Sequence, residues 1–70
     1  MNLIEGIQEK CNFIRSTILP EYEKLGTVGV FGATCLREDI RKGEQAIAGG
    51  DVEEMLLVYR QLVETCDSAL

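Results

Sequence analysis

The sequence predicts an all-α fold, a three-helix bundle that forms a single domain over residues 1–70. Apolar side chains recur every three or four residues in three successive segments, which is the spacing of one face of an α-helix. Glycines separate these segments, and Pro20 interrupts the first one. We therefore expect a long N-terminal helix that is kinked or broken near Pro20, followed by an antiparallel helical hairpin.

The first helix is expected to run from Asn2 to about Leu25. Asn2 is a good N-cap, and Glu5 follows it at the spacing of a capping box. Pro20 has no backbone N–H and disfavours a helical residue before it, so the helix bends there or consists of two pieces. Gly26 is a good terminator because glycine readily adopts the left-handed conformation. The apolar positions expected to face the core are Leu3, Ile4, Ile7, Cys11, Ile14, Ile18, Tyr22 and Leu25.

The second helix is expected to begin between Thr27 and Phe31 and to end at Gly49–Gly50. Its inner face contains several very small residues, which let a neighbouring helix approach closely. The positions predicted for this face are Gly29, Ala33, Leu36, Ile40, Gly43 and Ile47.

The third helix opens at Asp51, a good N-cap, with Glu54 at the reciprocal capping-box position. The turn before it is short, so the second and third helices should lie antiparallel. The chain is expected to fray over residues 67–70. The core face is predicted to contain Val52, Met55, Leu56, Tyr59, Leu62, Val63 and Cys66.

Cysteine and histidine usage bears on metal and disulfide support. The chain has three cysteines, Cys11, Cys35 and Cys66, at wide spacings, and no histidine. An odd number of thiols is atypical of a disulfide framework, and a zinc site would need a carboxylate as its fourth ligand. We expect reduced thiols, no metal and no cofactor. A chain this short then draws stability most readily from contact with another chain.

Charge and hydropathy limit the location and the partners. The net charge is −5, so nucleic acid and acidic membranes should repel most of the surface. No signal peptide is recognisable, and no apolar stretch approaches 18 residues. We expect a cytoplasmic protein that contacts neither nucleic acid nor membrane. The partner should be a protein or a small ligand.

Apolar residues that lie off the predicted core faces suggest the function. Without histidine the commonest general base is missing, and the acidic residues lie mainly on polar helix faces, so we expect no enzyme. Clustered apolar residues on a surface mark an interface. The sequence therefore predicts a helical interaction module that forms a homodimer or a higher oligomer, binds another protein, or does both. Its expected contact residues are Phe13, Phe31, Leu57 and Val58.

An alternative function is the binding of a nucleotide or another anion at the glycine-rich start of the second helix. Backbone N–H groups at such a start attract anions. No Walker pattern is present, and no strand precedes the loop as in a dinucleotide fingerprint. The same glycines also suit close helix packing. The residues that this alternative would use are Gly29, Gly32, Thr34, Arg37 and Arg41.

The stretch from Glu21 to Glu64 resembles short helical proteins encoded by bacteriophages and prophages. The resemblance is carried by Tyr22, by Gly29–Thr34, by Asp39–Ile40 and by the segment from Ala46 to Tyr59. It implies a phage-encoded accessory protein that acts in the bacterial cytoplasm and binds a host protein. It implies no activity for any individual residue.

Overall fold

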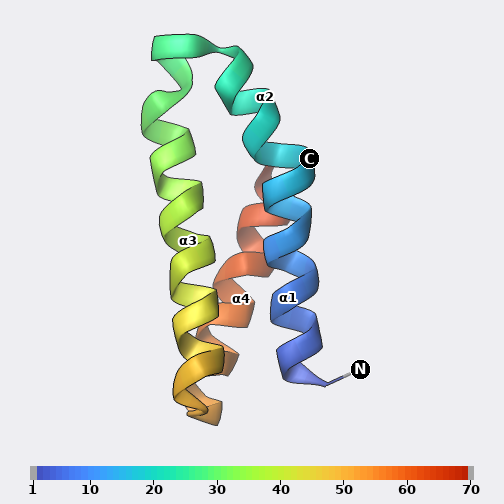
Figure 1. The fold of residues 1–70 in the computed structure, drawn as a ribbon. Coiled ribbons are helices and arrows are strands. Elements are labelled where there is room, and N and C mark those ends of the chain that lie inside the picture. The colour runs from blue at the N-terminus through green and yellow to red at the C-terminus, as the bar shows by residue number, and fades with distance from the viewer. Residues whose placement is uncertain (1, 70) are drawn as a thin grey trace.

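The computed structural model describes residues 2–69, which form three helical rods (Figure 1). The first rod contains two α-helices joined by a π-helical turn, and a short 3₁₀ turn connects it to the second rod. In chain order the elements are α1 (Leu3–Phe13), the π turn (Ile14–Ile18), α2 (Leu19–Lys24), the 3₁₀ turn (Gly26–Gly29), α3 (Val30–Gly49) and α4 (Val52–Ala69). The predicted all-α three-helix architecture is confirmed.

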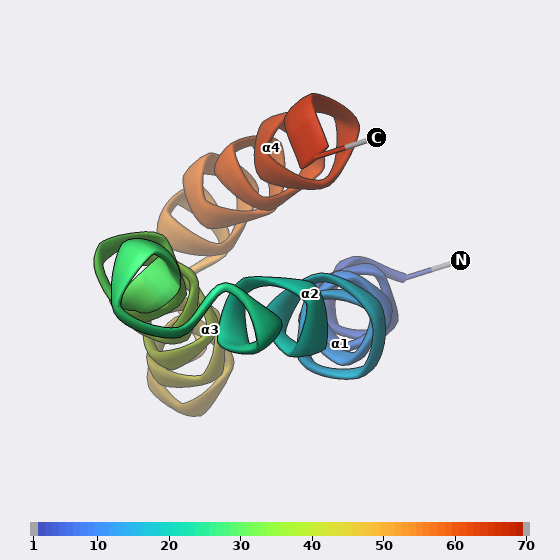
Figure 2. The ribbon, with the colours of Figure 1, turned by 90° about the horizontal axis from the view of Figure 1, so that it is seen from above.

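The three rods are arranged as an up-down-up bundle. The first rod and α4 run in the same direction, and α3 runs opposite to both (Figure 1). Seen from above, α4 lies on one side of the layer that the other two rods form (Figure 2). It packs against α1, α3 and the π turn. The C-terminal end of α4 stops short of the connection between α2 and α3, which therefore projects beyond it (Figure 1).

The predicted helix ends are confirmed at most positions. The Asn2 side chain accepts a hydrogen bond from the Glu5 amide at 2.8 Å. The Asp51 carboxylate accepts from the Glu53 amide at 3.0 Å. Gly50 follows α3 in the left-handed conformation, with φ of 71°, and so allows the chain to reverse. α3 itself begins at Val30, inside the expected range, and its N-cap residue is Gly29.

The π turn explains how the first rod accommodates Pro20. In this turn the Leu19 amide donates to the carbonyl of Ile14, five residues back. Pro20 then lies in the first turn of α2, where its missing N–H matters least. The rod therefore remains helical from Leu3 to Lys24. A π turn contains one residue more than an α-helical turn. The side chains that follow it are therefore rotated about the helix axis relative to those that precede it.

Because of this rotation, part of the core predicted for the first helix is wrong. Leu19 is not among the predicted core positions, yet it is buried, whereas Leu25 is among them and is 57% exposed. The third helix also differs, because Val52 and Leu56 are exposed. At the start of α1, Ile4 is exposed as well. The buried apolar residues are Ile7, Cys11, Ile14, Ile18, Leu19, Ala33, Leu36, Ile40, Ala46, Met55, Leu62 and Cys66.

The small residues of the 3₁₀ turn and of α3 allow the close helix packing that the sequence predicts. Gly29, Ala33 and Gly43 are buried. A Cβ atom at Gly43 would lie 3.0 Å from the Cys11 sulfur and 3.4 Å from Leu62 Cδ1. These contacts belong to the first rod and to α4, so Gly43 lies where all three rods meet.

Candidate protein-binding surfaces

The exposed apolar side chains fall mainly into two groups on the surface. The first group, which we call the tip patch, surrounds the connection between α2 and α3. Its members are Leu25, Val28, Val30 and Phe31. The second group lies in the N-terminal half of α4 and contains Val52, Leu56 and Leu57. Monomeric soluble proteins rarely expose contiguous apolar patches without a function for them.

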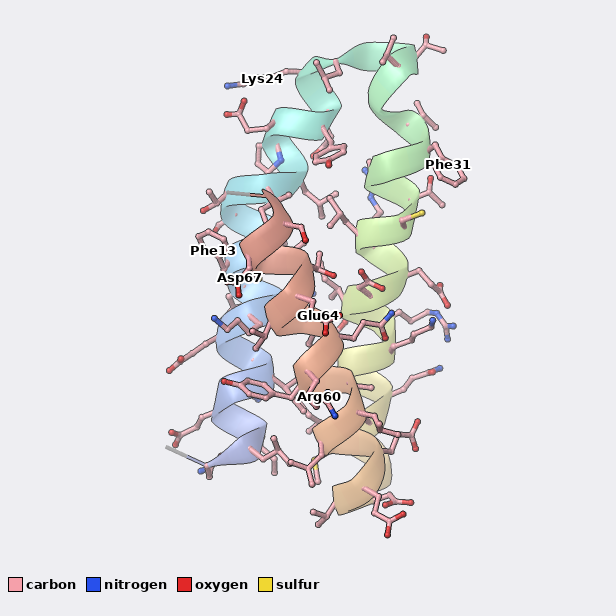
Figure 3. All side chains as sticks on the ribbon, turned by 180° about the vertical axis from the view of Figure 1, so that it is seen from behind. Phe13, Lys24, Phe31, Arg60, Glu64 and Asp67 are labelled. Carbon is pink, nitrogen blue, oxygen red and sulfur yellow. The ribbon has the colours of Figure 1, made fainter. Side chains whose placement is uncertain are left out.

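The tip patch lies at the end of the bundle that α4 does not reach (Figure 1). Val28 lies in the 3₁₀ turn and is 85% exposed, and Phe31, in the first turn of α3, is 81% exposed. Phe31 points outward from α3, away from the other rods (Figure 3). The predicted exposure of Phe31 is confirmed. The exposure of the other three members was not predicted from the sequence. Leu25 fitted the core pattern, and Val28 and Val30 lie where the start of the second helix was not fixed.

The second surface, which we call the α4 face, is a shallow groove lined by Glu53, Leu56, Leu57 and Arg60. These residues recur at i, i+3, i+4 and i+7, so they form one stripe along the helix. Leu57 is 66% exposed and Leu56 is 50% exposed. Arg60 lies on the side of α4 turned away from α1 and α3 (Figure 3). The sequence pattern identified Leu57 but missed Leu56.

Phe13 and Val58 do not belong to either surface. Both side chains are half-buried and pack against the hydrophobic core. Phe13 is the last residue of α1, the helix that packs against α4 and α3. The expectation that these two residues point away from the core was wrong, because both side chains pack against it. Their assignment as contact residues therefore loses its structural basis.

The space next to both glycines of the possible anion site is filled by Tyr22. A Cβ atom on Gly32 would overlap the Tyr22 ring, and one on Gly29 would overlap the Tyr22 carbonyl. The amide of Val30 donates to the carbonyl of Thr27 within the 3₁₀ turn. The glycine positions thus serve the close packing of α2 against α3.

The polar residues of the same candidate site have partners within the protein. The Thr34 hydroxyl donates to the Val30 carbonyl at 2.8 Å. Arg37 lies 3.8 Å from Glu23. Arg41 Nε donates to Glu38 at 2.9 Å, and this bond holds the pKa of the Glu38 carboxyl below its usual range. The anion site stays a prediction, and the geometry adds no support for it.

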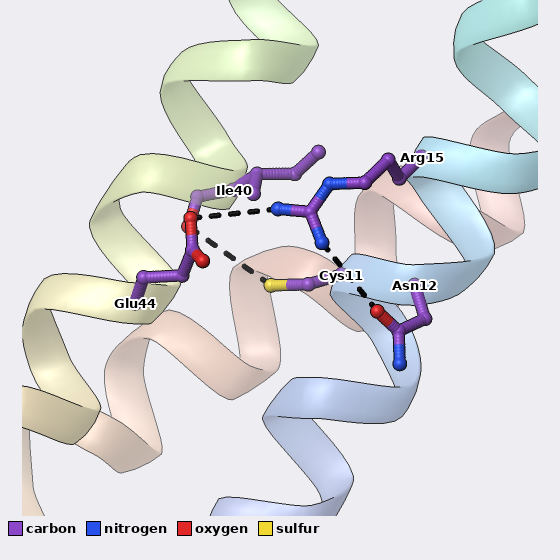
Figure 4. Close-up of polar contacts among 5 residues, drawn as sticks. All are labelled: Cys11, Asn12, Arg15, Ile40 and Glu44. Atoms are coloured by element: carbon purple, nitrogen blue, oxygen red, sulfur yellow. Dashed lines mark hydrogen bonds and ion pairs between the residues drawn. The ribbon is translucent and has the colours of Figure 1, made fainter.

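The three thiols occupy two kinds of environment. Cys35 is exposed, whereas Cys11 and Cys66 are buried. The Cys11 sulfur lies 4.0 Å from the Ile40 carbonyl, beneath Arg15, which contacts both Asn12 and Glu44 at 3.5 Å (Figure 4). Burial raises the pKa of the Cys11 thiol, and the nearby Glu44 carboxylate raises it further. Burial also raises the pKa of the Cys66 thiol.

The described part of the chain contains neither a cluster of metal-ligating side chains nor a membrane-spanning helix. Residues 2–69 contain no group of three or more potential metal-ligating side chains. None of their helices combines the length and the apolar character needed to cross a lipid bilayer. No protein-family model, curated protein or solved structure matches the chain.

Proposed function

We propose that this chain is a non-enzymatic helical interaction module that forms a homodimer and binds another protein. The observation that carries the proposal is the pair of exposed apolar surfaces, the tip patch and the α4 face. Burying apolar area against a partner is the main favourable term in protein association. A chain of 70 residues also gains stability from such burial, because its own core is small.

The two surfaces suit two different contacts. The α4 face is lined by two leucines and by charges of both signs, whereas the four residues that define the tip patch are all apolar. We assign the α4 face to the homodimer and the tip patch to a second protein, with Phe31 as its central contact. The resemblance to phage-encoded proteins suggests a host protein of the bacterial cytoplasm as this partner.

An affinity experiment with matched baits tests the binding of a second protein. Wild-type protein, Phe31→Asp and Gln45→Asp are immobilised and exposed to bacterial lysate. Gln45 is an exposed residue of α3 outside the tip patch, so its variant controls for the added charge. A stoichiometric partner retained by wild type and Gln45→Asp but lost by Phe31→Asp supports the proposal. Equal retention by all three baits contradicts the role of the tip patch.

A further inference from the structure

We infer that the α4 face binds the same face of a second copy of this chain, with the two α4 helices antiparallel. The inference rests on the proposed homodimer and names the surface and orientation through which it forms. It follows from the order of four residues along one stripe of α4, Glu53, Leu56, Leu57 and Arg60.

The order of these residues is self-complementary. An acidic residue begins the stripe, a basic residue ends it, and two leucines lie between them. A two-fold axis through the midpoint between Leu56 and Leu57 places each Leu56 opposite Leu57 of the other copy. The same axis places each Glu53 opposite Arg60 of the other copy. Two-fold dimers use one patch on both subunits, so a patch must complement itself, and this one does.

The charges of the α4 face are available for such a contact. The four ion pairs within residues 2–69 involve neither Glu53 nor Arg60. The two residues are seven positions apart, or about 10 Å along the helix axis, so they do not reach each other within one chain. Across the two-fold axis each lies about one helical turn from the centre of the contact. Two intermolecular ion pairs would then flank a central leucine cluster.

The same pattern excludes the parallel orientation. Parallel pairing would place Glu53 opposite Glu53 and Arg60 opposite Arg60, and like charges across an interface are unfavourable. The tip patch is defined by four apolar side chains, and the charged residues beside it, Glu23 and Lys24, already form ion pairs within the chain. Among the exposed apolar surfaces of residues 2–69, the α4 face is therefore the one suited to a second copy.

The length of the contact is set by where α4 begins. Glu64 and Asp67 continue the face toward the C-terminus (Figure 3). In the antiparallel dimer they lie beyond the first turn of the other α4. The paired stretch therefore runs from Val52 to Gln61, which is about half of the helix. So short a contact predicts reversible, concentration-dependent dimerisation.

Charge reversal at the two positions tests this geometry. Glu53→Arg would place two arginines opposite each other at both ends of the contact, and Arg60→Glu would do the same with two glutamates. We expect each variant alone to dimerise at least about tenfold more weakly than wild type, measured by sedimentation equilibrium. An equimolar mixture of the two variants should dimerise as wild type does, because every facing pair is then Arg opposite Glu. The double variant E53R/R60E should also dimerise.

Two exposed residues outside α4 provide matched controls. Glu9→Arg on α1 and Lys42→Glu on α3 make the same charge changes and should leave dimerisation unchanged. Recovery in the mixture shows that both single variants fold. A wild-type dimer that either single variant leaves intact, or a mixture that stays monomeric, would overturn the α4 pairing while leaving the homodimer itself standing. A monomeric wild type would overturn both.

Discussion

Gly43 is the residue at which the packing of the bundle is most easily tested. A Cβ atom there would lie 3.0 Å from the Cys11 sulfur and 3.2 Å from Ile7 Cγ2. We expect Gly43→Ala to lower the free energy of unfolding by about 1 kcal/mol or more, because overpacking outweighs the better helix propensity of alanine. Gly49→Ala is the control, since nothing lies within 4 Å of a Cβ there. Chemical denaturation that ranks both variants equally would contradict the close packing at Gly43.

The thiols offer a second prediction at the scale of single residues. Only the thiolate reacts with a disulfide reagent, and burial protects Cys11 and Cys66. One thiol, Cys35, should therefore react rapidly in the native protein, and the other two only after unfolding. Cys35→Ser should remove the rapid phase. Rapid labelling of two or three thiols in the native state would contradict the burial of Cys11 and Cys66.

The buried thiols also predict a pH dependence of stability. Burial raises the pKa of Cys11 and Cys66 in the folded state, so the unfolded chain releases these protons first as the pH rises. The free energy of unfolding should be unaffected by these thiols at neutral pH and should fall between about pH 8 and about pH 10. Denaturation of Cys11→Ala/Cys66→Ala should show a smaller fall than Cys35→Ser. Equal slopes would contradict this assignment.

At the scale of secondary-structure elements, the π turn decides which leucine of the first rod enters the core. Leu19 is 7% exposed and Leu25 is 57% exposed. We expect Leu19→Ala to cost about 2–5 kcal/mol of stability and Leu25→Ala about 0.5 kcal/mol or less. A rod that continued as a regular α-helix would give the opposite ranking. The pair of variants, compared by chemical denaturation, therefore tests the π turn directly.

The N-cap of α4 makes another prediction for an element. The Asp51 carboxylate accepts hydrogen bonds from the amides of Glu53 and Glu54, at 3.0 and 3.4 Å. Asp51→Ala should lower the free energy of unfolding by about 0.5–2 kcal/mol. Asp51→Asn keeps an accepting oxygen and should lie close to wild type in the same denaturation experiment. An alanine variant as stable as the asparagine variant would show that this cap contributes nothing.

The elements also show how far sequence reasoning reaches. Capping residues and glycine turns act locally, so Asn2, Asp51 and Gly50 could be assigned from the sequence. The inner faces of the helices depend on an unbroken period of 3.6 residues, and the π turn breaks that period between Phe13 and Leu19. No residue pattern in the sequence predicts the π turn, although Pro20 indicates that the helix must be distorted near this position.

The surfaces were harder to predict because they depend on how the rods fit together. Phe31 and Leu57 could be recognised, since each lies off its helix's apolar stripe and is exposed in the fold. Phe13 and Val58 lie off their stripes too, but both are half-buried against the core. Leu56 lies on a stripe, yet α4 is tilted so that the rest of the bundle leaves half of it uncovered. Which off-stripe residues are exposed depends on how the helices pack against one another, and the periodicity of the sequence does not determine this packing.

At the scale of the whole molecule, this small bundle exposes apolar surfaces, which we propose serve contacts with other chains. Eight large apolar side chains are exposed among the described residues, against twelve apolar residues in the core. Leu57→Asp, at the centre of the α4 face, should weaken self-association without unfolding the monomer, because Leu57 is 66% exposed. Light scattering checks the mass, and circular dichroism checks the helix content. A variant that remains as dimeric as wild type would remove the α4 face from the contact.

The central claim is that this chain associates with itself, and sedimentation equilibrium of the wild-type protein tests it most directly. The average mass should rise with protein concentration from the 7.8 kDa of one chain toward twice that value. A mass that stays at 7.8 kDa at every concentration, up to about 1 mM, would contradict the claim.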